Sequence, residues 1–220
     1  MSEAAIELET VNRYYGKHPA VKRLSLRVPC GSIFGFVGAN GAGKTTTIRM
    51  IVGHLHPPEG TVRTLGGDPW CHTAETRARV AYVSEEMDLP AWMTPEKAIG
   101  FCAPLYPNWD HALAEELLDA FSLRGKGRFP TLSKGQQRRL CLLLALCQRA
   151  DLLVMDEPAS GLDPAARRDL LDRILAIACD GGRRTVFISS HILTDLERVA
   201  DRVAFLRGGE LVLTGELERT

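Results

Sequence analysis

The sequence predicts an α/β fold: a core built on a parallel sheet, with an N-terminal antiparallel β layer and an inserted α-helical arm. A short apolar run, Ile33-Phe34-Gly35-Phe36-Val37, ends in glycine, as a buried strand entering a loop does. Two further strand-like runs, 152–155 and 185–188, are separated by a helical pattern around 165–178, and that alternation indicates a parallel sheet. Residues 87–129 have a helical pattern punctuated by proline, which predicts the arm.

The N-terminal elements follow from local patterns. Residues 6–8 and 25–28 alternate polar and apolar side chains, which predicts strands of a smaller antiparallel sheet with one solvated face. A helix is expected over 46–52, and Pro57-Pro58-Glu59-Gly60 is expected to form the turn that leaves it.

The C-terminal elements carry clearer end signals. Ser133 is expected to open a long helix that runs to Cys147. Residues 202–206 and 210–213 flank Gly208-Gly209, a strong signal for a β-hairpin. Asp110 can cap an earlier helix, whose apolar stripe would consist of Leu113, Leu117, Leu118 and Phe121.

Composition excludes several classes of protein. Among 220 residues, 27 basic and 27 acidic side chains balance, so no net field attracts nucleic acid or an anionic membrane. The six cysteines show no CxxC pair, which suits a reducing compartment. No N-terminal signal segment is visible, and the longest apolar run, 140–147, is far short of the ~20 residues that span a bilayer. We expect a soluble protein without direct membrane insertion.

Residues 38–45 have the G-x-x-x-x-G-K-T spacing of a phosphate-binding loop. Glycines let backbone N–H groups approach phosphates without an intervening Cβ, and the following helix directs its positive end at the same anions. Lys44 is expected to reach the β- and γ-phosphates of ATP, Thr45 to ligate Mg²⁺ and Thr46 to add a phosphate contact. The other residues expected to bind the phosphates are Gly38, Asn40, Gly41 and Gly43. A glycine-rich turn that only mimics the spacing is the alternative.

Two carboxylates, Asp156 and Glu157, end the apolar strand at 152–155. Asp156 is expected to hold Mg²⁺, directly or through water. Glu157 is the candidate catalytic base, because a carboxylate beside the metal can orient the attacking water and accept its proton. The alternative is a helix N-cap followed by a first-turn acid.

Between these motifs lies Leu132-Ser133-Lys134-Gly135-Gln136. With this segment the chain resembles the ATP-binding-cassette (ABC) ATPases, from near its N-terminus to its end. The resemblance implies a P-loop NTPase core forming a single domain over 1–220, with a helical subdomain at approximately 87–150. It also implies that Ser133, Gly135 and Gln136 complete the ATP site of a second chain, so that the working unit is a homodimer or heterodimer.

The resemblance assigns roles to further residues. The loop 158–163 matches the family's D-loop, with Asp163 at its interface position. His191, which follows an apolar strand, corresponds to the switch histidine that contacts the γ-phosphate and the water held by Glu157. Tyr15 falls where the family places an aromatic ring that stacks on adenine, with the adjacent Tyr14 as its rival. The implied catalytic set is therefore Glu157, His191 and Lys44.

The chain departs from the family pattern at Glu85, where a glutamine is usual. A carboxylate can still ligate Mg²⁺ but cannot donate an amide hydrogen bond. In the 132–136 segment, Lys134 stands where glycine is the commonest residue of the family. The stretch Tyr106-Pro107-Asn108-Trp109-Asp110 is similar to one in bacterial efflux-type ATPases and favours export. Trp92 and Trp109 are expected to pack inside the helical arm.

The leading hypothesis is an ATP-binding and ATP-hydrolysing subunit of a membrane transporter, most consistent with an exporter. Two cassettes would sandwich two ATP molecules and drive a conformational change in a separate integral membrane permease. The protein would be cytoplasmic and peripheral on the inner face of the cell membrane, with no nucleic acid partner. The alternatives are a soluble ABC-family ATPase switch, a small-molecule or nucleotide kinase, and a cassette that binds ATP without hydrolysing it.

Overall fold

The computed structural model describes residues 4–86, 88–179 and 184–217, and it confirms the α/β fold. The described residues form a six-stranded sheet of order β5-β6-β7-β3-β8-β9. All neighbours from β5 to β8 pair in parallel, and β9 closes the edge antiparallel to β8. In chain order the strands are β3 (Ile33–Gly38), β5 (Val80–Val83), β6 (Leu152–Met155), β7 (Thr185–Ser190), β8 (Arg202–Arg207) and β9 (Glu210–Glu216).

A second sheet is antiparallel, as the alternating pattern predicts. It consists of β1 (Ala4–Tyr15), β2 (His18–Pro29) and β4 (Glu59–Thr64), in the order β2-β1-β4. β4 was not expected, because its first two residues lie in the predicted turn at 57–60. Gly60 has φ +85°, and a Cβ there would lie 2.5 Å from the Glu9 carbonyl oxygen, so close pairing with β1 decides this segment.

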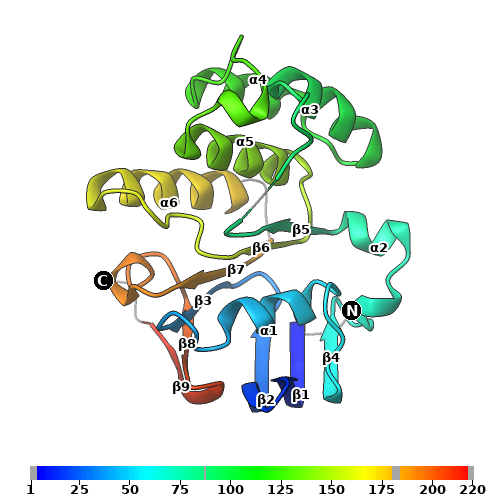
Figure 1. The fold of residues 1–220 in the computed structure, drawn as a ribbon, viewed down its shortest axis with the longest axis vertical. Helices are drawn as coiled ribbons and strands as arrows, with labels where there is room; N and C mark the ends of the chain where they lie inside the picture. Colours follow the sequence, from blue (N-terminus) through cyan, green and yellow to red (C-terminus); the bar gives the residue numbers. More distant parts are fainter. Residues whose placement is uncertain (1–3, 87, 180–183, 218–220) are drawn as a thin grey trace.

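The helices are α1 (Lys44–Ile51), α2 (Ala74–Ala78), α3 (Pro95–Cys102), α4 (His111–Ala120), α5 (Lys134–Cys147) and α6 (Pro164–Cys179). Short 3-10 turns are η1 (Pro69–Cys71), η2 (Ala103–Leu105), η3 (Phe129–Thr131) and η4 (Leu193–Asp195). α1 lies between the two sheets, whereas α3, α4 and α5 gather at the opposite end of the molecule (Figure 1). Met87, where the helical subdomain was predicted to begin, lies outside the described residues.

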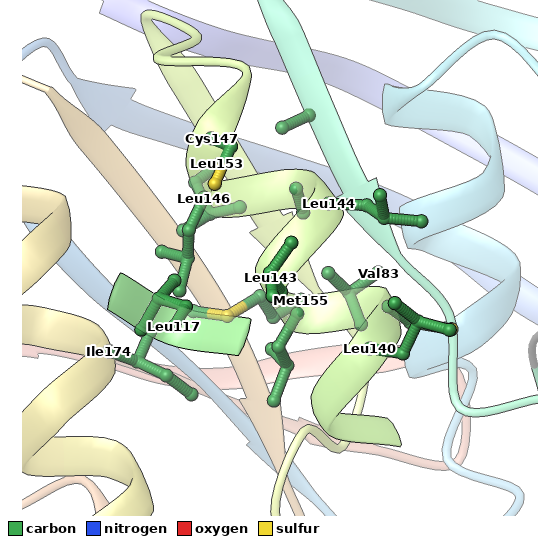
Figure 2. Packing of buried hydrophobic residues seen from close by; sticks show 14 of the residues in the cluster. Val83, Leu117, Leu140, Leu143, Leu144, Leu146, Cys147, Leu153, Met155 and Ile174 are labelled. Carbon is green, nitrogen blue, oxygen red and sulfur yellow. The ribbon is translucent and has the colours of Figure 1, made fainter. Parts of the chain in front are cut away.

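The large sheet separates two apolar cores. One core joins the sheet to α1 and the antiparallel sheet through residues such as Phe36, Ile48 and Phe187. The other joins it to the helices, where Leu117 of α4 and Ile174 of α6 flank the leucines of α5 (Figure 2). Burying each such side chain contributes about 1.5–3 kcal/mol, so this packing fixes the helices against the strands that carry the site.

The two tryptophans of the helical region differ. Trp109 is 8% exposed and belongs to the helical core, as predicted. Trp92 is 55% exposed, so the expectation that it packs inside the arm is wrong. It lies just before Met93, which is buried in its place.

Candidate functional site

The phosphate-binding loop connects β3 to α1, and neighbouring backbone packs tightly against it. A Cβ on Gly43 would lie 2.3 Å from the Ala20 carbonyl oxygen, and one on Gly38 would lie 2.6 Å from the Leu206 carbonyl oxygen. Gly43 also has φ +105° and stands immediately before the first turn of α1. That conformation lets α1 begin at Lys44, two residues earlier than the sequence pattern predicts. The loop can therefore bring its N–H groups close to an anion.

Lys44 is almost completely buried at the base of this loop, with 6% of its surface exposed. Its ammonium donates to the carbonyl oxygens of Gly38 at 2.5 Å and Ala39 at 3.2 Å. The same nitrogen lies 3.2 Å from Glu157 Oε1. This last contact is an ion pair and not a hydrogen bond, because no donor hydrogen points at Oε1 among the described residues. The loop and the carboxylate after β6 thus meet at one cation.

Glu157 has an unusual backbone conformation, with φ +50°, which is uncommon for a residue with a side chain. Its N–H donates to Ser189 Oγ at 3.0 Å, and its carboxylate is buried. Glu157 Oε2 lies 2.8 Å from His191 Nδ1, and because an ionised carboxylate only accepts, the imidazole N–H is the donor. The structure therefore brings Lys44, Glu157 and His191 together in a continuous array.

Asp156 supplies a buried oxygen that no protein group satisfies. The residue is 0% exposed, and its Oδ1 accepts a hydrogen bond from Ser189 Oγ at 2.5 Å, whereas Oδ2 has no partner among the described residues. Asp156 lines a cleft together with Thr45 and Glu85. A carboxylate oxygen that is buried and unpaired, beside a hydroxyl and a second carboxylate, fits the all-oxygen ligand set that Mg²⁺ prefers.

Ser189 was not among the predicted site residues, yet it bonds both the Asp156 carboxylate and the backbone of Glu157. Its position near the end of a strand parallel to β6 was the available signal, because carboxyl ends of parallel strands meet at one edge of a sheet.

Tyr15 and Tyr14, the two candidates for adenine stacking, are both exposed, by 48% and 43%. They end β1, where alternate side chains point to opposite faces. The Arg13 guanidinium lies 5.4 Å from the centre of the Tyr15 ring, which covers one face of that ring.

The Ser133 segment is built as a helix start. Ser133 Oγ accepts from the Gln136 N–H at 3.3 Å, and Gln136 Oε1 accepts from the Ser133 N–H at 3.0 Å, which forms a complete capping box. Gly135 lines a cleft with Glu85 and Gly161. Among the described residues, no hydrogen bond or ion pair joins 133–136 to Lys44 of the same chain. Asp163 is exposed.

The fold and this site define a phosphate-loop nucleotide-binding protein. Comparison with family models then matches residues 21–160 to the family described as ABC transporter. The chain belongs to this family, and it is the ATP-binding, ATP-hydrolysing subunit of a transporter.

Curated relatives are similar in sequence to this chain over almost its whole length. It is 37% identical to the Nod factor export ATP-binding protein I of Paraburkholderia xenovorans, covering 98% of this chain and 72% of the relative. It is 34% identical to the daunorubicin/doxorubicin resistance ATP-binding protein of Streptomyces peucetius, covering 97% and 67%. It is 31% identical to the bacitracin transport ATP-binding protein of Enterococcus faecalis, covering 96% and 68%.

Solved structures support the same fold. An ATP-binding subunit of an ABC transporter has a TM-score of 0.83 at 28% identity, covering 97% of this chain and 90% of that one. A dimeric bacterial ABC transporter cassette has a TM-score of 0.83 at 21% identity, covering 98% and 100%, and that likeness extends to the fold alone. No helix within 4–86, 88–179 and 184–217 has the length and apolar character needed to cross a membrane.

Proposed function

We propose that the array around Glu157 is the ATP-hydrolysing centre, and that this cassette drives export through a separate integral membrane permease. The observation that carries the proposal is the convergence of Lys44, Glu157 and His191 beside the unpaired buried oxygen of Asp156. If Asp156 and Glu157 were only a helix N-cap and a first-turn acid, Glu157 would not need to contact Lys44 and His191. The same array argues against a cassette that binds ATP without hydrolysing it.

Each residue then has a defined task. Lys44 and the N–H groups of the loop balance the charge of the β- and γ-phosphates. Glu157 orients the attacking water and accepts its proton, while His191 holds the carboxylate through Oε2. Asp156, Thr45 and Glu85 would hold Mg²⁺, which supplies charge neutralisation on the phosphates. Tyr15 would stack on the adenine ring.

Two cassettes are proposed to form the working unit. Ser133 is exposed, and the start of α5 presents N–H groups and a positive helix end, which suit a γ-phosphate bound by another chain. Gly135, Gln136 and Asp163 would contribute to the same interface. Within each chain we propose one domain over 1–220, with residues 87–150 as its helical subdomain. The partner cassette is a second copy or a paralogue.

Export is favoured because the name of the Nod factor relative specifies export and that of the Streptomyces relative specifies resistance to daunorubicin and doxorubicin. The permease would hold the cassette at the inner, cytoplasmic face of the membrane. We propose no nucleic acid partner. The soluble ATPase switch is the competing function. Recovery of tagged protein from native membranes with a stoichiometric polytopic membrane protein supports transport, and recovery with ribosomes or nucleic acid favours the switch.

The catalytic assignment is tested with Glu157→Gln. This variant keeps the size of the side chain and one oxygen that accepts hydrogen bonds, but it cannot take up the proton of water. We therefore expect ATP binding without turnover and an ATP-dependent dimer. Equilibrium binding, phosphate release and light scattering measure the three properties. Turnover within tenfold of wild type would remove Glu157 from the role of base. If Glu157→Gln binds ATP but stays monomeric, the working unit is not a dimer of two identical chains.

A further inference from the structure

The carbonyl groups of the D-loop are held by arginines from two different helices. Arg138 of α5 donates through Nη1 to Ser160 O at 2.5 Å and to Glu157 O at 3.2 Å. Arg167 of α6 donates through Nη2 to Leu162 O at 3.0 Å. Each guanidinium has a planar fork of donors, so it can hold two segments at once.

Arg167 also forms an ion pair with Asp195, which ends the turn η4. Nη1 lies 3.4 Å from Asp195 Oδ2, and the two side chains are only 14% and 13% exposed. The pair borders a small pocket that His191 and Glu157 also line. Because it is largely shielded from water, the pair is screened less by salt than a surface ion pair. Arg167 therefore connects Leu162 in the D-loop to Asp195.

Asp195 is joined to His191 by a compact turn. Ser190 Oγ accepts from the Ile192 N–H at 3.0 Å, and the buried Leu196 donates its N–H to the Leu193 carbonyl oxygen at 2.8 Å. The His191 side chain itself is 36% exposed and is positioned by one bond, to Glu157 Oε2 at 2.8 Å. Asp195 and His191 therefore belong to one short, hydrogen-bonded segment that follows β7.

We propose that Arg167 and Asp195 are a positioning pair that makes the placement of His191 depend on the D-loop. The inference rests on the proposed function, in which His191 assists hydrolysis and the D-loop faces the partner cassette. A shift of Leu162 on closure of the dimer is transmitted through the Arg167 guanidinium to Asp195, and from there to His191 against Glu157. Hydrolysis would then be licensed by assembly rather than by ATP binding alone.

The test measures ATP turnover and ATP affinity in Arg167→Met and Asp195→Asn. Breaking the pair misplaces His191 without touching the phosphate loop, so we expect kcat to fall about tenfold while KM and the equilibrium Kd for ATP stay within about twofold. Arg168→Met is the matched control, because Arg168 is the next residue of α6 and is exposed. It is expected to retain wild-type kcat.

A double-mutant cycle separates a pair from two independent structural effects. If the residues act as one unit, Arg167→Met combined with Asp195→Asn loses no more than either single change. Independent effects would multiply to a loss of about a hundredfold. Thermal melting accompanies each variant. If Arg167→Met unfolds, Asp195→Asn decides alone, because it keeps the shape of the side chain and removes only its charge.

The inference is overturned if Asp195→Asn turns over ATP within about twofold of wild type, or if the two losses multiply. It is also overturned if KM rises in step with the fall in kcat/KM, because binding rather than positioning would then be lost. Failure of the proposed function has a different signature. In that case Glu157→Gln continues to hydrolyse ATP, whatever the Arg167 variants do.

Discussion

Lys44 shows how a single residue joins two parts of the site that lie far apart in the sequence. Its ammonium is shared between the loop carbonyls and the carboxylate of Glu157, and the two side chains are 6% and 7% exposed. Removing one partner of a buried ion pair leaves an uncompensated charge, a loss of about 3–5 kcal/mol. A substitution at Lys44 should therefore keep a hydrogen-bond donor, so that loss of catalysis is not confused with loss of fold.

Stacking on adenine is a residue-scale prediction that a pair of adjacent variants can test. Tyr15→Ala is expected to raise the Kd for ATP by about tenfold, since aromatic–base stacking contributes on the order of 1–3 kcal/mol. Tyr14→Ala, on the opposite face of β1, is the matched control and should leave the Kd unchanged. Equilibrium titration with ATP measures both. If Tyr14→Ala alone weakens binding, the adenine platform is Tyr14.

At the scale of elements, the cap of α4 also ties that helix to the end of α5. Asp110 Oδ1 accepts from the Leu113 N–H at 2.9 Å, Oδ2 accepts from Arg149 Nε at 2.8 Å, and the Asp110 N–H donates to the Cys147 carbonyl oxygen at 2.8 Å. The bond from Leu113, followed by the bond from Arg149, holds the pKa of Asp110 below its usual value. The ionised form of Asp110 is therefore more stable in the folded state than in the unfolded state.

This lowered pKa predicts a loss of stability in acid. A group with a depressed pKa in the folded state stabilises the protein above its unfolded pKa of about 3.9, and the contribution disappears as the pH falls through the folded pKa. Asp110→Asn retains the cap but loses the charge, so it should melt at a lower temperature than wild type at pH 7. The difference should shrink below about pH 4.

Calorimetry or circular dichroism across this pH range measures the difference in melting temperature. Glu116→Gln is the control, because Glu116 is an exposed acid on the same helix. If the melting difference between wild type and Asp110→Asn is the same at pH 7 and pH 3, the carboxylate charge plays no part in holding α4 to α5.

At the scale of the whole molecule, the proposed ATP site is divided between two chains, and mixing two inactive variants tests this division. Lys44→Gln disables the phosphate loop and keeps a hydrogen-bond donor. Ser133→Arg blocks the start of α5 at an exposed residue. Each variant alone should be inactive, because every site in its homodimer has one defective half.

A mixed dimer would contain one site with both halves intact. Half of the dimers in an equal mixture are mixed, so ATP turnover should recover to about a quarter of the wild-type value if the sites are independent. Phosphate release against mixing ratio measures the recovery. Absence of recovery, when both variants fold and Ser133→Arg binds ATP, would show that the natural partner is a paralogue.

Sequence patterns predicted most elements of the fold because local chemistry fixes them. The hairpin around Gly208-Gly209 and the helices opened by Asp110 and Ser133 formed as expected, since positive φ and side-chain caps act within a few residues. The strands 6–8 and 25–28 were predicted too short, and β4 was missed. The remaining residues of β1 and β2, and all of β4, become strands by pairing with a neighbouring strand, which no local pattern shows.

By itself the sequence determined the phosphate-binding loop, the paired carboxylates, the Ser133 segment and the α/β class, because spacing and side-chain chemistry are written in its order. The tertiary structure alone decided that Ser189 bonds the Asp156 carboxylate and the Glu157 backbone, that Lys44 meets Glu157, and that Arg167 joins the D-loop to Asp195. Apart from the short-range bond between Arg167 and Leu162, these contacts span long stretches of sequence. They exist because parallel strands bring their carboxyl ends to one edge of the sheet, and no periodicity along the chain records that meeting.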